Sequence, residues 1–168
     1  MHDVIIVGAG VAGCYLARKL HDLDVLVIER DPTIRLKDSG IVSRHFTKFV
    51  KKKSLLKDKI KEMDIVSASG ANLEIRGKTP FAYILHRERF SEFLRNRVKD
   101  RIQYEYIQKI KRENDCISVT TKDGTHMCKM IVGCDGTNSI VRKFGGIKEP
   151  AISVGVMVKG ANIPHSRI

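Results

Sequence analysis

The residues with the clearest chemical potential stand near the amino terminus. Gly8, Gly10 and Gly13 form a GxGxxG pattern directly after the β-branched run at residues 3–7. Gly8 would permit a tight turn, Gly10 would let the backbone approach a pyrophosphate, and Gly13 would let a helix pack closely on a strand. The N–H groups that open this helix, including that of Ala12, would face the phosphates. The pattern predicts a dinucleotide-binding loop, and the strand before it and the helix after it disfavour glycines that only turn the chain.

An acidic residue follows at the spacing that such a loop requires. Glu29 ends the apolar run Val25–Ile28, about 20 residues beyond the first glycine. A carboxylate there can accept hydrogen bonds from both ribose hydroxyls and would repel a 2′-phosphate, which favours FAD or NAD over NADP. Arg30 is a further candidate contact but does not by itself argue for a 2′-phosphate. The alternative is an ordinary exposed acid at a strand end.

These residues need a strand, a helix and a second strand to position them. We expect strands at Asp3–Val7 and Val25–Ile28 and a helix over Val11–Leu20, where Leu16, Ala17 and Leu20 recur at helical spacing. A βαβ unit of this length forces the two strands to be parallel. The sequence therefore predicts an α/β fold with a Rossmann-like βαβ domain.

The rest of the chain alternates further short strands with helices. Glu88–Val98 and Ser139–Phe144 have helical patterns, and Lys122–Gly124 has the composition of a hairpin turn. The remaining apolar runs predict strands at Asp64–Ala68, Leu73–Ile75, Ala82–Leu85, Gln103–Tyr106, Cys116–Thr121, Met127–Val132 and Ile152–Val158.

A basic segment after Ser43 also has helical spacing. Phe46, Phe49 and Val50 would share one face of a helix capped by Ser43, with cations added at Arg44, Lys48, Lys51 and Lys52. Such a helix could lie on an anionic membrane surface. A solvated face over a small apolar stripe is the more favoured interpretation.

Length and composition limit the classes of protein to consider. A chain of 168 residues with 42% hydrophobic residues fits one packed domain, and its net charge of +12 favours anionic partners. Nucleic acid is disfavoured because no recognition motif accompanies the charge. There is no apolar run long enough to span a bilayer and no signal peptide, so we expect a cytoplasmic protein. The four cysteines lack metal-ligand spacing, which predicts reduced thiols and no metal site.

Four segments together resemble FAD-dependent oxidoreductases of the p-hydroxybenzoate hydroxylase fold and, within them, the archaeal geranylgeranyl reductase family. VIIVGAGVAG with VLVIER is similar to the amino-terminal FAD fingerprint, although the connection between helix and strand is short and lacks the usual glycine. KDSGIVS at residues 37–43 resembles the loop beside the flavin, with Asp38 where many members have Cys. The other two segments are YILHRERFSEFLRNRV at residues 83–98 and IVGCDGTNSIVRK at residues 131–143.

The resemblance implies a fold and a set of cofactor contacts. Residues 1–150 would form the FAD-binding domain with a strand-rich insertion, and residues 151–168 would begin a substrate-binding sheet. Gly40 would lie beside the flavin, and Arg87 and Asp135 would lie near the FAD phosphates and ribityl chain. Without the resemblance, Arg87 would be a surface arginine and Asp135 part of a turn. Catalytic residues cannot be chosen, because in such enzymes the flavin carries the hydride.

The resemblance also implies an activity. Members saturate isoprenoid double bonds of lipids by hydride transfer from reduced flavin, with NAD(P)H or a ferredoxin as reductant. The alternatives are a flavin-dependent monooxygenase of aromatic hydroxylase type and a non-catalytic FAD- or NAD-binding module completed by a partner chain. The family's later Gly-Asp motif has no counterpart here. We therefore expect an amino-terminal portion, a split-gene product or a short relative, and no turnover by this chain alone.

Overall fold

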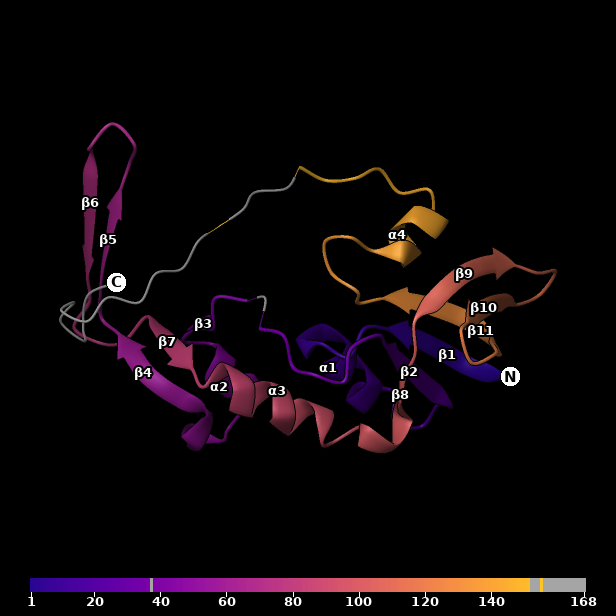
Figure 1. The fold of residues 1–168 in the computed structure, drawn as a ribbon. Coiled ribbons are helices and arrows are strands. Elements are labelled where there is room, and N and C mark those ends of the chain that lie inside the picture. The colour runs from indigo at the N-terminus through magenta and orange to yellow at the C-terminus, as the bar shows by residue number, and fades with distance from the viewer. Residues whose placement is uncertain (37, 152–154, 156–168) are drawn as a thin grey trace. The chain divides into compact units, whose positions relative to one another are not determined.

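A computed structural model describes residues 1–36, 38–151 and 155. Its described residues form two compact units (Figure 1). Unit 1 contains Met1–Arg35 and residues 91–151, and unit 2 contains the described part of Leu36–Phe90 together with Gly155. No described helix is long and apolar enough to cross a membrane.

Unit 1 is built around a six-stranded mixed sheet with the strand order β8-β2-β1-β11-β10-β9. Neighbours from β8 to β11 are parallel, whereas β11, β10 and β9 form an antiparallel meander. The predicted parallel pairing of β1 with β2, the turn at Lys122–Gly124 and the α/β class are confirmed. The strands are β1 (His2–Val7), β2 (Val25–Glu29), β8 (Ile102–Tyr104), β9 (Ile107–Arg112), β10 (Ile117–Thr121) and β11 (Thr125–Gly133).

The core of unit 1 explains why β1 and β2 read as continuous apolar runs. Ile5 and Ile6 are both 0% exposed although they point to opposite faces, because helices or loops cover both faces of the sheet. On one face Ile140, Val141 and Phe144 of α4 (Ile140–Phe144) pack against the cluster that contains Ile5. Figure 1 shows α4 beside the β9–β11 meander.

Two further helices belong to this unit wholly or in part. Helix α1 (Val11–Lys19) contacts β1 and β2, and α3 (Arg87–Arg95) begins in unit 2 and ends in unit 1. Arg101, in a 3₁₀ turn at Lys99–Arg101, donates hydrogen bonds to the carbonyls of Ala17, Leu20 and His21 at 2.9–3.2 Å. This guanidinium satisfies the Ala17 carbonyl in the last turn of α1 and also binds two carbonyls just beyond the helix.

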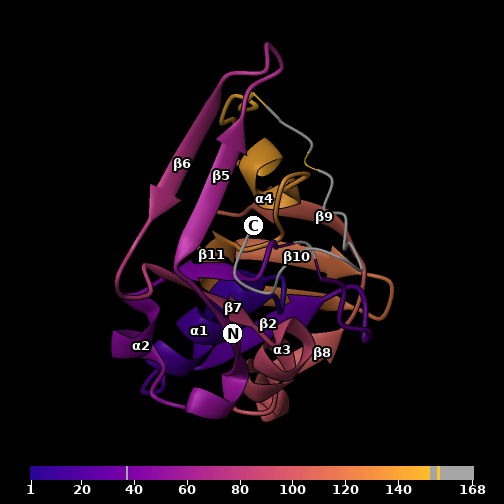
Figure 2. The same cartoon turned by 90° about the vertical axis from the view of Figure 1, so that its left-hand side faces the viewer.

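Unit 2 contains a three-stranded antiparallel sheet and a separate hairpin. Its sheet has the order β3 (Ile41–Ser43), β7 (Ala82–Leu85) and β4 (Leu56–Ile60). The hairpin pairs β5 (Glu62–Val66) with β6 (Asn72–Arg76), and Figure 2 shows these two strands side by side. Unit 2 also holds the short helix α2 (Phe46–Phe49) and a 3₁₀ turn at Lys53–Leu55.

The predicted basic helix after Ser43 is wrong in its extent. Ser43 does not cap a helix, because it lies in β3 and pairs with Ala82 of β7. Helix α2 has one turn, and Val50 is already extended with φ −130° and ψ 104°. Pairing with β7 on both sides therefore draws the flanking residues into strands, and the amphipathic helix does not form.

Three strands were absent from the sequence expectation, namely β3, β4 and β9. In β4 and β9, lysines and arginines interrupt the apolar alternation, and both strands lie at sheet edges where charged side chains stay in water. The other predicted strands and helices are present with shifts of a few residues at their ends. The strand predicted at Ile152–Val158 lies outside the described residues.

Candidate functional site

The glycine-rich loop connects β1 to α1 in a conformation that requires glycine at two positions. Gly8 has φ +103°, and a Cβ atom there would lie 2.5 Å from the carbonyl oxygen of Cys134. A Cβ on Gly13 would lie 1.9 Å from the carbonyl oxygen of Gly8. The Gly8 N–H donates to the carbonyl of Ile28 at 2.8 Å. The loop therefore packs tightly against the end of β2, the residue that follows β11, and its own helix α1.

Gly10 has the opposite environment. A Cβ atom on Gly10 would meet no described atom within 4 Å, and its backbone is extended at φ −77° and ψ −170°. Gly10 precedes the first turn of α1, where Ala12 is exposed and no acidic side chain is present. The open backbone and the positive end of the helix fit a phosphate group.

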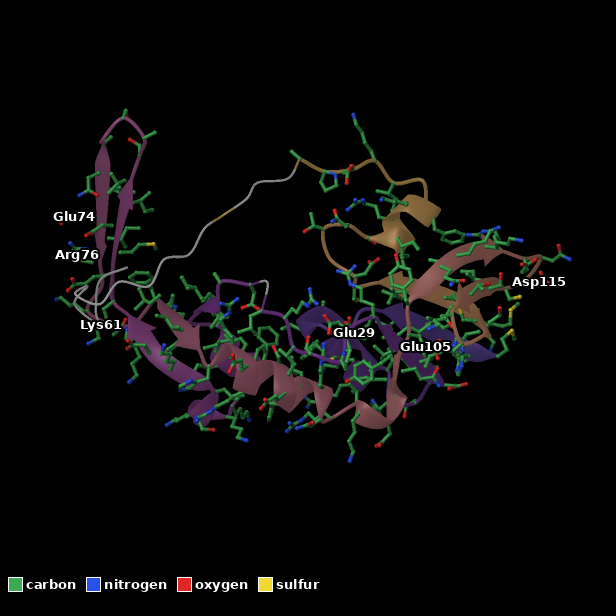
Figure 3. All side chains as sticks on the ribbon, in the orientation of Figure 1. Glu29, Lys61, Glu74, Arg76, Glu105 and Asp115 are labelled. Carbon is green, nitrogen blue, oxygen red and sulfur yellow. The ribbon has the colours of Figure 1, made fainter. Side chains whose placement is uncertain are left out.

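Glu29 lies at the carboxyl end of β2, where Figure 3 labels it. Its Oε2 accepts the Ala9 N–H at 2.8 Å, and its Oε1 accepts the Asp31 N–H at 3.1 Å. Each carboxylate oxygen has a second lone pair, and the side chain is 15% exposed. Glu29 can therefore order the loop and still accept hydrogen bonds from ribose hydroxyls. Arg30 follows as an exposed residue.

Arg95 of α3 is a site residue that the sequence analysis missed. Its Nε donates to the Ala9 carbonyl at 3.1 Å, and one terminal nitrogen donates to the Pro32 carbonyl at 2.9 Å. Its other terminal nitrogen lies 3.9 Å from Oε2 of Glu29, and the side chain is 13% exposed. Arg95 is the last residue of α3 and directly follows the buried Leu94, so helical spacing does not place it on the buried face and gave no signal for its role.

Asp135 follows β11 and joins the same edge of the sheet. The Cys134 N–H donates to the Val7 carbonyl at 2.7 Å, which brings this segment against the glycine-rich loop. Asp135 Oδ2 accepts the Ile140 N–H at 2.6 Å. Its Oδ1 is buried and has no hydrogen-bond partner among the described residues. A buried carboxylate oxygen without a donor is costly, so this atom fits a ligand hydroxyl.

Burial keeps the thiols of this region neutral. It raises the pKa of Cys14 to about 11, even though the positive charge of Arg95 acts to lower it. Burial also raises the pKa of Cys134, and the negative charge of Asp135 adds to the shift. Neutral thiols place no additional negative charge beside a bound phosphate.

Gly40 and Arg87 come together in unit 2. Gly40 has φ +70°, and a Cβ there would lie 2.6 Å from Cγ of Arg87, so the glycine makes room for the arginine stem. Arg87 Nε lies 3.3 Å from Oδ1 of Asp38. That Nε is buried and finds no hydrogen-bond acceptor of good geometry in the described chain. The Arg87 side chain is 25% exposed, so its fixed positive charge can attract an anionic ligand.

The predicted contacts thus fall into two groups. Unit 1 gathers most of them at the carboxyl ends of parallel strands β1, β2 and β11, which is where open α/β sheets bind ligands. Unit 2 holds the other two, Gly40 and Arg87. Clusters that could hold a metal ion are absent from the described residues. Unit 1 contains Gly8, Gly10, Ala12, Gly13, Glu29, Arg30 and Asp135.

A family model described as FAD dependent oxidoreductase matches residues 3–120. The chain belongs to the FAD-dependent oxidoreductase family. The cofactor of this family is FAD, in agreement with the expectation from the glycine pattern and Glu29. The matched residues include the whole loop, Glu29 and α3.

An uncharacterized protein of Methanosarcina barkeri is 29% identical over 161 residues, covering 88% of this chain and 41% of that protein. Among solved structures, OxyS anhydrotetracycline hydroxylase from Streptomyces rimosus is 25% identical with a TM-score of 0.69. That similarity covers 90% of this chain and 35% of the hydroxylase. Halogenase PltM, solved with phloroglucinol and FAD, is 17% identical with a TM-score of 0.64, over 86% of this chain and 36% of PltM, and shows the same fold. The chain therefore spans about two-fifths of the length of the relative it matches.

Proposed function

We propose that the chain binds FAD through the glycine-rich loop, Glu29 and Asp135 of unit 1. Gly40 and Arg87, which adjoin each other within unit 2, are further proposed contacts that the resemblance implies. The observation that carries this assignment is the buried, unpaired Oδ1 of Asp135 beside a loop whose Gly10 is open. Asp135 Oδ1 requires a hydrogen-bond donor, and the open backbone at Gly10 leaves room for a phosphate group. Both needs are met by a dinucleotide with a hydroxylated linker.

Each group has a distinct task in this proposal. The N–H groups opening α1 would bind the pyrophosphate, and Glu29 would accept hydrogen bonds from the adenosine ribose. Asp135 Oδ1 would accept a hydrogen bond from the ribityl chain or its neighbourhood. Arg87 would donate to phosphate oxygen, since a guanidinium is a fixed cation with several donors. Arg95 positions the loop through Ala9 and does not itself need to contact the cofactor.

For the reaction, we propose reduction of isoprenoid double bonds in lipids, as the resemblance to geranylgeranyl reductases implies. FAD supplies the redox chemistry by carrying a hydride between a reductant, NAD(P)H or a ferredoxin, and the substrate. The second candidate is aromatic hydroxylation, which the similarity to OxyS anhydrotetracycline hydroxylase supports equally well. A non-catalytic FAD-binding chain that acts with a partner is a third candidate.

FAD binding is tested first, by flavin absorbance and calorimetry on the purified chain. Gly10→Val places a branched side chain where the backbone must meet the pyrophosphate, and we expect it to abolish measurable FAD binding. Thr79→Val, at an exposed position in unit 2, is the control and should bind normally. Normal flavin absorbance in the Gly10→Val protein would overturn the assignment.

Glu29→Ala tests the ribose contact. It removes charge-assisted hydrogen bonds, and we expect FAD affinity to fall about tenfold to a hundredfold. Glu88→Ala, an exposed acid on α3, is the matched control. Circular dichroism must show that the variant is folded, because Glu29 also holds Ala9 and Asp31. Unchanged affinity in the folded variant would make Glu29 a structural residue only.

Product analysis separates the two reactions. The protein is incubated with FAD and a chemical reductant without oxygen, together with a geranylgeranyl lipid, and the lipid is examined by mass spectrometry. A gain of hydrogen atoms in pairs supports the reductase. A gain of one oxygen atom by a phenolic substrate, only in air and with NAD(P)H, supports the hydroxylase. If FAD binds and neither product forms, the result agrees with the expectation that this chain alone does not turn over, and it supports the third candidate, an FAD-binding chain that acts with a partner.

A further inference from the structure

The positive charge of the chain is concentrated in one segment of unit 2. Residues 44–61 contain eight of the 31 lysines and arginines, and Asp58 is the only acidic residue among them. Seven of these eight cations are lysines. Lysine is a compact, strongly hydrated point charge that suits attraction to a diffuse anionic surface more than a fixed fork of hydrogen bonds.

The folded chain arranges four of these lysines around a hollow. Lys51, Lys53, Lys57 and Lys59 line a depression of about 750 Å³, whose walls include Val50 and Leu56. All four lysines are exposed. Asp58, also in the lining, accepts the backbone N–H of Lys59 at 2.7 Å. The hollow therefore combines a cationic rim with apolar lining.

An exposed aromatic side chain, Phe49 of α2, lies in the same lysine-rich segment. Phe46 of α2 packs edge-on against Phe90 with ring centroids 5.3 Å apart. Phe49, at the other end of this helix, is instead 68% exposed. Lys48 precedes it and Lys51 follows it closely. An apolar ring displayed among cations, next to a cationic hollow, is the composition of a surface that meets the boundary of a lipid bilayer.

We propose that this cationic surface, defined as Phe49 with Lys51, Lys53, Lys57 and Lys59, docks on membranes that contain anionic phospholipids. The lysines would surround a headgroup phosphate at the hollow, and Phe49 would enter the interface between headgroups and acyl chains. No amphipathic helix is needed, because a helical turn, a 3₁₀ turn and β4 together present these residues. The proposal does not rest on the proposed function, since it involves neither FAD nor catalysis.

Protection of a sheet edge and binding of nucleic acid account less well for these lysines. Lysines keep edge strands from pairing with other chains, and β4 is an edge strand. That purpose does not extend to Lys51, Lys53 or the exposed Phe49, which all precede the strand. Nucleic acid would also attract lysines, but the aliphatic residues in the hollow favour lipid over a phosphodiester backbone.

The first experiment is co-sedimentation of the whole chain with vesicles. We expect binding to phosphatidylcholine vesicles containing phosphatidylglycerol and no binding to phosphatidylcholine alone. The affinity should fall steeply as salt is raised, since ions screen exposed charges. Equal binding to both kinds of vesicle, or no binding to either, would overturn the proposal. So would a mixed-sequence RNA or DNA duplex that binds the chain more tightly than the anionic vesicles do.

Two variants that lose the same number of lysines, one in the cationic surface and one elsewhere, test where the vesicle binds. Changing Lys51, Lys53, Lys57 and Lys59 to Gln should weaken vesicle binding on the order of 100-fold or more, since each lysine near an anionic surface contributes about fivefold. The control changes four exposed lysines of unit 1 to Gln and reaches the same net charge. Equal losses in both variants would overturn the proposal, because total charge alone would then explain binding. The control positions are Lys99, Lys109, Lys111 and Lys122.

A fluorescent reporter tests the insertion of Phe49. The chain contains no tryptophan, so Phe49→Trp introduces a single indole. Its emission should shift to shorter wavelength when anionic vesicles are added, because the ring leaves water. Tyr106→Trp, at a 63% exposed position in unit 1, should show no shift. A shift at residue 106 without one at residue 49 would overturn the assignment. Because both variants keep every lysine, this test remains valid if the fourfold variant fails to fold.

Discussion

Two segments, one in each unit, differ in how far their apolar side chains are buried. In unit 1, strand β1 contains Ile5 and Ile6, which are both 0% exposed. In unit 2, the β5–β6 hairpin leaves Ile65 and Leu73 at 48% and 58% exposed, although they face each other across the two strands. The hairpin is instead laced by charge, with Arg76 within 2.7–3.7 Å of carboxylate oxygens of Asp64, Glu74 and Glu62 (Figure 3).

The buried strands and the exposed hairpin suit different tasks. A loop that must hold phosphate within hydrogen-bond distance needs a rigid base, and unit 1 supplies it with a two-sided core. Unit 2 retains side chains in water, where they are accessible to other molecules. The predictions below test whether stability is concentrated in unit 1.

The largest loss of stability is expected when a glycine of the glycine-rich loop is replaced by alanine. Gly13→Ala puts a Cβ 1.9 Å from the Gly8 carbonyl oxygen, so the helix and loop must separate. We expect a loss of more than about 3 kcal/mol in the free energy of unfolding, measured by urea denaturation. Gly70→Ala in unit 2 meets no atom and should cost only about 1 kcal/mol for its φ of +85°. Similar losses of unfolding free energy in the Gly13→Ala and Gly70→Ala variants would contradict the idea that the loop of unit 1 is the more tightly packed.

Removal of one buried side chain tests the contrast directly. Ile5→Ala leaves a cavity in a fully buried site, and we expect a loss of about 2–5 kcal/mol. Ile65→Ala, the same change on the exposed hairpin, should alter stability by less than about 0.5 kcal/mol. Urea denaturation measures both. A larger loss at residue 65 would show that the apolar face of the hairpin is covered in solution.

A partly buried acid gives a smaller, pH-dependent effect. Burial alone would raise the pKa of Glu105, but hydrogen bonds to Thr121 and to His126 Nε2, which lies 2.9 Å from Oε2, outweigh it and lower the pKa. The ionised form is therefore stabilised in the folded protein. Its contribution is complete above the ordinary carboxyl pKa and disappears as the pH falls through the lowered one.

Glu105→Gln should accordingly cost about 1 kcal/mol at pH 7, the usual contribution of a hydrogen bond, and the loss should shrink as the pH is lowered from 7 toward 3. Urea denaturation of both proteins across this range checks the prediction. Glu88→Gln, at an exposed position in unit 2, should show a small loss that does not change with pH. A pH-independent loss at residue 105 would contradict the role of its charge.

The smallest effect concerns thiol chemistry within unit 1, which contains all four cysteines. Cys14 and Cys128 are buried, and burial raises the pKa of both thiols. With iodoacetamide at pH 7.5, we expect mass spectrometry to find these two unmodified while Cys116 reacts first. Rapid modification of Cys14 would show that the helix beneath the loop opens readily.

The sequence predicted unit 1 well because its signals are local. β1 and β2 are apolar on both faces, and Gly8 and Gly13 of the loop each lie where a Cβ atom would clash with backbone. The predicted contacts Gly8, Gly13 and Glu29 have the positions that the fingerprint requires. The buried state of Asp135 Oδ1 could not be predicted, because it depends on the packing of β11 and α4.

Unit 2 was harder to predict because its structure depends on partners distant in sequence. Val50 and its neighbours have helical spacing, yet pairing of β4 with β7 overrides that preference. Arg95 illustrates the same limit, since its partners Ala9 and Pro32 lie far away in the chain.

The place of β11 has a consequence for biosynthesis. β1 is synthesised well before one of its two neighbours in the sheet, β11, which begins at Thr125. The glycine-rich loop is completed by the bond from Cys134 N–H to the carbonyl of Val7. Until Cys134 has left the ribosome, β1 cannot pair with β11, and the glycine-rich loop lacks its contact with the segment after β11. The proposed nucleotide site is therefore completed only after Cys134 has been synthesised, long after its glycine-rich loop.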